Sequence, residues 1–127
     1  MSDVPDDLMY TKKHEWARIQ GNTVTVGLTD HAQNELTDVV YVELPEVGDE
    51  FQAGDEIAVV ESVKSTSDVF TPVGGKVIEV NSSLEDAPET INSEPYGNGW
   101  LVKLECASTS SELLVSPGDY KAYLDSL

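Results

Sequence analysis

Short β-prone runs separated by glycine, proline or asparagine are the feature of this sequence that most restricts its fold. Several such runs in succession are typical of a compact sandwich or barrel. The 127 residues are about the length of one domain, and no linker-like stretch divides them. We therefore predict a single, mostly β domain over residues 1–127.

The first two runs, Trp16–Ile19 and Thr23–Leu28, flank a Gly21-Asn22 turn. Val24, Val26 and Leu28 alternate with smaller or polar residues, which predicts a hairpin with one buried face. Turns at Gly48-Asp49 and Gly54-Asp55 separate later runs. The remaining strands are expected at residues 38–44, 56–61, 73–80 and 100–104.

Two segments have helical patterns. Asp30–Gln33 has the spacing of a capping box, and Ala32 and Leu36 would share one face of a short internal helix. Ser116 is a suitable cap for a C-terminal helix with Pro117 in its first turn. The apolar face of that helix would consist of Tyr120, Tyr123, Leu124 and Leu127. Residues 82–94 are polar and are predicted to be mostly loop.

The charge of the chain excludes several classes of partner. Seven Lys and Arg against 24 Asp and Glu give a net charge of 7 − 24 = −17, which repels nucleic acid and anionic membranes. No apolar run is long enough to span a bilayer, and residues 1–7 lack the character of a secretory signal or a mitochondrial presequence. We expect a cytoplasmic monomer, and the single cysteine, Cys106, fits a reducing compartment.

Residues that would form a self-sufficient active site are missing from the sequence. His14, His31 and Cys106 are too few and too far apart to indicate a zinc site. There is no phosphate-binding loop and no Gly-x-Ser-x-Gly elbow. We therefore predict no catalytic residue and no metal ligand.

Lys64 lies in a context that separates it from an ordinary surface lysine. An apolar strand, Ile57–Val60, precedes the polar interval 61–68, and a second apolar run begins at Val69. Lys64 is near the middle of this interval and hence at the apex of a hairpin. Paired strands would hold the backbone there while the side chain projects clear of the protein, an arrangement that suits a carrier.

The sequence resembles the glycine cleavage system H protein family over nearly its whole length. The segments that carry this resemblance are His14-Glu15-Trp16, Gly27–Gln33, Val42–Pro45, Glu61–Ser65, Ser67-Asp68, Pro72 with Gly75, Glu79–Asn81, and Asn92–Gly97 with Gly99-Trp100. Their order and spacing together are highly specific. Ser65 departs mildly from the family pattern, because alanine often fills this position.

The resemblance implies a fold, a cofactor and a role. The fold would be a barrel-sandwich hybrid related to lipoyl and biotinyl domains. Lys64 matches the family's lipoyl lysine, so (R)-lipoate would be attached there as N6-lipoyllysine. The oxidised arm of the family accepts an aminomethyl group from a pyridoxal-phosphate glycine decarboxylase. An aminomethyltransferase then passes the carbon unit to tetrahydrofolate, and dihydrolipoyl dehydrogenase reoxidises the arm.

The chain would then be a non-catalytic carrier subunit that supplies positioning and partner recognition. A lipoyl-attaching enzyme is a further implied partner. The cationic nitrogen of the loaded arm would be favoured by a nearby carboxylate, for which Glu15 and Asp68 are the candidates; both could equally be ordinary solvated acids.

Three alternatives remain open from the sequence. A lipoyl domain of a 2-oxoacid dehydrogenase or a biotin carrier belongs to the same class, although Val63 and Ser65 replace the Met residues that flank a biotinyl lysine. A lipoyl donor to other proteins would use the same acylated lysine for a different purpose. An enzyme with its own active site has no residue pattern to support it.

Overall fold

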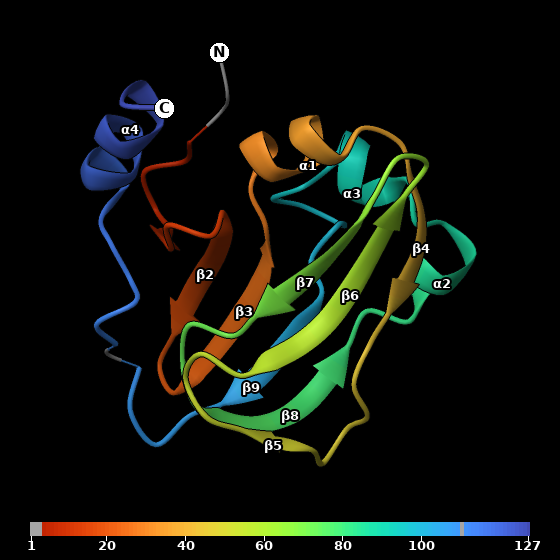
Figure 1. The fold of residues 1–127 in the computed structure, drawn as a ribbon. Coiled ribbons are helices and arrows are strands. Elements are labelled where there is room, and N and C mark those ends of the chain that lie inside the picture. Colours follow the sequence, from red (N-terminus) through yellow and green to blue (C-terminus); the bar gives the residue numbers. More distant parts are fainter. Residues whose placement is uncertain (1–3, 110) are drawn as a thin grey trace.

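The computed structural model describes residues 4–109 and 111–127. In chain order its elements are β1 (Met9–Tyr10), β2 (Glu15–Gln20), β3 (Thr23–Leu28), α1 (Asp30–Leu36), β4 (Val39–Glu43), β5 (Glu50–Phe51), β6 (Glu56–Ser62), β7 (Thr66–Phe70), β8 (Gly75–Val80), α2 (Ser83–Asp86), α3 (Thr90–Ser93), β9 (Val102–Glu105) and α4 (Pro117–Asp125). The strands form two sheets, and the long β6–β7 hairpin crosses in front of the larger one (Figure 1).

The larger sheet has the strand order β1-β2-β3-β9-β8-β5, with every neighbouring pair antiparallel. Its first hairpin is the predicted one: Glu15 pairs with Leu28 and Gln20 with Thr23. Gly21 has a φ of 65° in the turn, a conformation that glycine adopts without strain. Val24, Val26 and Leu28 are buried as expected, but Thr25 and Gly27 on the other face of β3 are buried as well, so the prediction of only one buried face was wrong for this strand.

The smaller sheet has the order β4-β6-β7 and packs against the larger one. Buried aliphatic side chains from both sheets meet in one continuous core, including Val26 and Leu104 from the larger sheet and Val60 and Val69 from the smaller. Burial of this apolar surface is the main force that holds the two sheets together.

The internal helix is confirmed, but its cap is not Asp30. Thr29 precedes the helix in an extended conformation, and its hydroxyl accepts the Ala32 N–H. The prediction of a mostly looped segment at 82–94 was wrong. The four-residue helices α2 and α3 each bury one apolar side chain, Leu84 and Ile91 respectively.

The C-terminal helix begins as predicted, with Ser116 accepting the Asp119 N–H and Pro117 in the first turn. Tyr120 is fully buried and stacks on Tyr10 with 4.7 Å between ring centroids. Leu127 was wrongly assigned to the buried face, because the helix ends at Asp125 and Leu127 is 65% exposed.

A second cluster of buried residues is separate from the main core and anchors α4. Its members are Leu8, Tyr10, Trp16 and Tyr120. The indole N–H of Trp16 donates to the Pro95 carbonyl at 2.9 Å. None of the helices in the described part of the chain is long and apolar enough to cross a membrane.

Candidate functional site

Lys64 lies at the tip of the β6–β7 hairpin, as the sequence predicts. It is exposed, and only residues 63–65 separate the two strands. Ser62 closes the turn, because its N–H donates to the Ser65 carbonyl at 2.8 Å and its hydroxyl oxygen accepts the Ser65 N–H at 3.1 Å. Within residues 4–109 and 111–127, the Lys64 ammonium forms no ion pair. The amine is therefore accessible, and the backbone that carries it is held in place by hydrogen bonds.

Strand β4 supports the hairpin tip from one side. The Val63 N–H donates to the Asp38 carbonyl at 3.1 Å, and Val39 pairs with Ser62. The backbone on the N-terminal side of Lys64 is thus hydrogen-bonded both across the turn and to a neighbouring strand. These contacts fix the direction in which Lys64 leaves the protein.

Glu15 is a buried acid and not a solvated one. It is 2% exposed at the start of β2. Its Oε1 accepts the Thr11 hydroxyl at 2.7 Å and its Oε2 accepts the Phe70 N–H at 3.1 Å. Burial raises the pKa of Glu15, and the two hydrogen bonds partly oppose this rise. The carboxyl group thus has a weakened preference for its ionised form and would gain from a cation brought close to it.

Asp68 lies on β7 opposite Val59 and is exposed. It faces Glu56, and its hydrogen bond and negative charge raise the pKa of Glu56. Asp68 therefore belongs to an acidic surface that it shares with Glu56. The exposure of Asp68 agrees with the alternative that it is an ordinary solvated acid.

The structure does not bring Glu15 and Asp68 into one pocket. Glu15 lines a depression of about 310 Å³ together with Phe70 and Leu113. Asp68 lines a second depression, of about 380 Å³, which the hairpin residues Ser65–Asp68 share with α1. Lys13 contributes to both, and its ammonium lies 4.0 Å from the centre of the Phe70 ring.

His14 and His31 are far apart in the sequence, and their contact was not predicted from it. Their ring centroids are 4.4 Å apart beside the Asp68 depression. The hairpin register carries a signal for this contact: Glu15 pairs with Leu28, so the next position brings His14 to Thr29, near His31. The Thr29 N–H donates to the His14 carbonyl at 3.0 Å.

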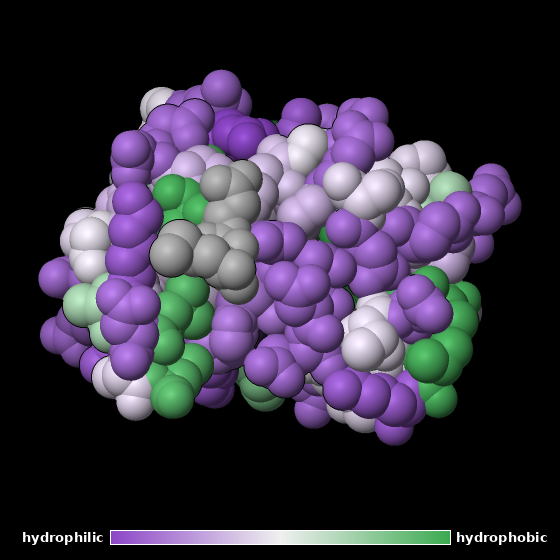
Figure 2. Space-filling view, turned by 90° about the horizontal axis from the view of Figure 1, so that it is seen from above, coloured by the Kyte–Doolittle hydropathy of each residue, from purple (hydrophilic) through white to green (hydrophobic). Residues whose placement is uncertain are grey.

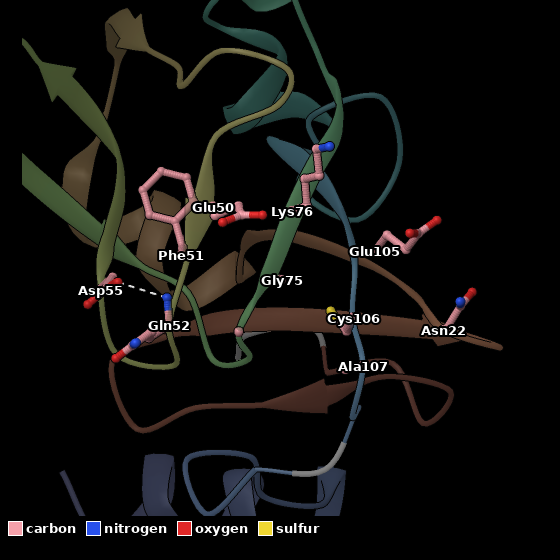
Figure 3. Close-up of a pocket in the computed structure, with 11 residues that line it drawn as sticks. Asn22, Glu50, Phe51, Gln52, Asp55, Gly75, Lys76, Glu105, Cys106 and Ala107 are labelled. Atoms are coloured by element: carbon pink, nitrogen blue, oxygen red, sulfur yellow. Dashed lines mark hydrogen bonds between the residues drawn. The ribbon is translucent and has the colours of Figure 1, made fainter.

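A third depression, about 790 Å³ and larger than the other two, lies at the other end of the large sheet and involves none of the predicted site residues (Figure 3). Gly75 and Cys106 meet there, and a Cβ at Gly75 would lie 2.9 Å from the Cys106 sulfur. Burial raises the pKa of the Cys106 thiol, which disfavours the reactive thiolate. The side chain of Cys106 is buried, with 3% of its surface exposed.

Comparison with known proteins adds to this geometry. The family model described as "Glycine cleavage H-protein" matches residues 8–127. The chain belongs to the glycine cleavage H-protein family. It is 53% identical over 125 residues to a glycine cleavage system H protein of Rubrobacter xylanophilus, with 98% of each chain covered. It is 57% identical to one of Stenotrophomonas maltophilia, with 100% of this chain and 96% of that one covered.

A solved structure of a family member also matches the fold. The crystal structure of a glycine cleavage system H protein from Mycobacterium marinum superposes with a TM-score of 0.88 at 38% identity, covering 98% of this chain and 100% of that one. The predicted fold class is confirmed: the protein is mostly β, with two packed sheets, an internal helix α1 and a C-terminal helix α4. It is a barrel-sandwich hybrid of the lipoyl-domain type.

Proposed function

We propose that this H protein is the lipoyl-bearing carrier of a glycine cleavage system, with (R)-lipoate in amide linkage at Lys64. The observation that carries the proposal is the position of Lys64, exposed at the apex of a hairpin whose backbone is fixed by Ser62, Ser65 and Asp38. Acylation needs an amine that an enzyme can reach, and transport needs a backbone that holds the modified lysine in a fixed place. Lys64 meets both conditions.

When bound, lipoate supplies a disulfide that can accept an aminomethyl group and electrons and can later pass them on. The chain's own residues position it and present it to the enzymes of the system. We propose those partners to be glycine decarboxylase, aminomethyltransferase, dihydrolipoyl dehydrogenase and the lipoyl-attaching enzyme, with the chain as a non-catalytic subunit. We propose the supply of lipoyl groups to other proteins as a second role of the same amide.

We also propose that Glu15 and Asp68 contact the cationic nitrogen of the loaded arm. The raised pKa of Glu15 supports its part, because a nearby cation would relieve the cost of ionising a buried carboxyl group. Asp68 lies on the hairpin strand that follows Lys64. Since the two acids line different depressions, we expect them to act at different positions of the arm.

Intact-mass analysis of the protein purified from its native host tests the assignment of Lys64. We expect the mass of one lipoyl amide on the wild type and its complete loss in Lys64→Arg. Biotin at Lys64, or lipoate that persists in Lys64→Arg, would contradict the proposal. With purified glycine decarboxylase, only the modified wild type should exchange labelled bicarbonate into glycine, whereas a 2-oxoacid carrier should not.

The hydrolysis rate of the aminomethyl-loaded protein tests the two acids. We expect faster hydrolysis in Glu15→Gln and Asp68→Asn than in the wild type, with Glu15→Gln the larger effect because the side chain is buried. Glu105→Gln, at the far end of the sheet, is the matched control. Equal rates in all four proteins would remove both acids from the proposal.

A further inference from the structure

Strand β4 carries an irregularity beside the Lys64 hairpin. Val39 pairs with Ser62 and Tyr41 pairs with Glu61, so β4 uses two residues where β6 uses one. A β-bulge of this kind interrupts the alternation of side chains and re-aims them. Val40 and Tyr41 are consequently both exposed, to 52% and 51%, although they are consecutive in a strand.

Val63 extends the same apolar surface to the hairpin tip. It is 67% exposed and immediately precedes Lys64, and its N–H is bonded to Asp38 at the start of β4. Tyr41 is also close to the tip along the hairpin, because its partner Glu61 precedes Lys64 by three residues. Viewed from above, the molecule is mostly hydrophilic, with hydrophobic side chains gathered in a few separate patches (Figure 2).

Acidic residues surround this apolar surface. Asp38 and Glu43 are exposed at the two ends of β4, and Glu61 lies opposite Tyr41. A partner that covers the surface must therefore offer an apolar pocket flanked by basic side chains, because charge complementarity selects partners and steers their approach. Tyrosine is among the residues that contribute most to binding when an interface covers them.

The reaction at Lys64 indicates which partner covers this apolar surface. This inference rests on the proposed function of Lys64 as the lipoyl attachment site. An enzyme that acylates Lys64 meets a chain that has no arm. The amine itself must enter its active site, so the protein surface within about a lysine's reach of the hairpin tip must touch the enzyme. Enzymes that react later with the end of a long arm do not face this restriction.

We infer that Val40, Tyr41 and Val63 form the docking surface for the enzyme that makes the amide at Lys64. That enzyme must distinguish one lysine from five others in the chain, Lys12, Lys13, Lys76, Lys103 and Lys121. In the reaction, Nζ attacks the carbonyl carbon of an activated lipoyl donor. A C–N bond forms, the bond to the leaving group breaks, and two of the three ammonium protons pass to a base or to solvent.

Steady-state lipoylation with a purified lipoate ligase, (R)-lipoate and ATP tests the surface, with intact mass as the readout. We expect Tyr41→Ser to raise KM about tenfold with little change in kcat, and Val40→Ser combined with Tyr41→Ser to raise it further. Ile78→Ser is the matched control, because Ile78 is 41% exposed on β8 in the other sheet. We expect its kinetics to equal those of the wild type.

Acetylation of Lys64 by a small reagent, followed by peptide mass analysis, separates docking from distortion of the hairpin. We expect equal acetylation rates in the wild type and Tyr41→Ser. A slower rate in Tyr41→Ser would overturn the inference, and so would unchanged enzymatic kinetics. If the wild type itself is not lipoylated, the proposed function fails; if it is lipoylated and Tyr41→Ser behaves identically, only the docking surface fails.

Discussion

The hairpin tip and the aromatic cluster beneath α4 are held in place by different forces. At the tip, Ser62 and Ser65 form a small network of hydrogen bonds in contact with water. In the cluster, Trp16 and Tyr120 are fully buried, and the Tyr120 hydroxyl lies 2.9 Å from both His14 Nδ1 and Thr29 Oγ1. The hydrogen bonds of the tip fix the direction in which Lys64 leaves the protein, whereas the buried cluster contributes to the free energy of folding.

This difference separates the two things that a carrier needs. A tip that buries little apolar area can be reached and acylated without disturbing the core. A buried cluster keeps the terminal helix on the body of the protein. Substitutions in the cluster should therefore change stability and leave the reactivity of Lys64 intact, and substitutions at the tip should do the opposite.

Tyr120→Ala should give the largest loss of stability. It removes the stacking on Tyr10 and the one buried side chain of α4, which should lower the free energy of unfolding by about 3–5 kcal/mol. Val63→Ala at the tip is the control and should change it by less than about 0.5 kcal/mol. Urea unfolding followed by tryptophan fluorescence measures both, and comparable losses in the two variants would contradict the comparison.

Gly27→Ala should have the next largest effect. A Cβ at Gly27 would lie 2.5 Å from the Trp16 ring, and the indole cannot move away easily because its N–H is bonded to Pro95. Overpacking of this kind costs about 1–3 kcal/mol. Ala58→Gly, at a buried position of β6, is a second core substitution that adds no atoms. A stability of Gly27→Ala equal to that of the wild type would show that Trp16 has room to shift.

The parts of the fold that depend on local patterning could be predicted from the sequence. Alternating apolar residues and a Gly-Asn turn define the β2–β3 hairpin, and an apolar-polar-apolar order places Lys64 at the apex of the separate β6–β7 hairpin. Ser116 and Pro117 mark the start of α4 because capping is a property of neighbouring residues.

Features that depend on contacts between distant segments could not be predicted. Glu15 is buried because the Phe70 N–H, 55 positions away, supplies one of its hydrogen bonds. The exposure of Val40 and Tyr41 follows from a bulge, which is a property of strand pairing and not of one strand. The short helices α2 and α3 escaped notice because each buries a single side chain, which leaves no periodic pattern.

His14→Asn should flatten the pH dependence of stability below neutrality. Burial lowers the pKa of His14 from 6.5, the charge of His31 lowers it further, and Glu35 opposes this. As the pH falls from 6.5 to the folded pKa, the unfolded chain binds a proton that the native state does not, so the wild type loses stability. Asparagine tolerates the positive φ of 71° at this position and has no charge to gain.

The free energy of unfolding, measured in urea at pH values between 7 and 5, checks this prediction. The stability advantage of the wild type over His14→Asn should shrink as the pH falls. The raised pKa of Glu15 acts in the opposite direction, because a native state that binds a proton first gains stability as the pH falls towards 4.5. This contribution is common to both proteins and cancels in the difference. If the difference in stability between the wild type and His14→Asn did not change with pH, a group other than His14 would have to cause the pH dependence.

Ser62→Ala should have the smallest effect on stability and a local effect on the tip. The hydroxyl accepts the Ser65 N–H and donates to the Ser65 carbonyl, both at 3.1 Å, but water can replace these bonds at an exposed turn, so the loss should stay below about 0.5 kcal/mol. Amide hydrogen exchange at Ser65 should nonetheless become faster, because its donor loses a fixed acceptor. Exchange in the β2–β3 hairpin should be unchanged. If Ser62→Ala instead lowered global stability as much as Gly27→Ala, the tip would be part of the folding core and the contrast with the aromatic cluster would fail.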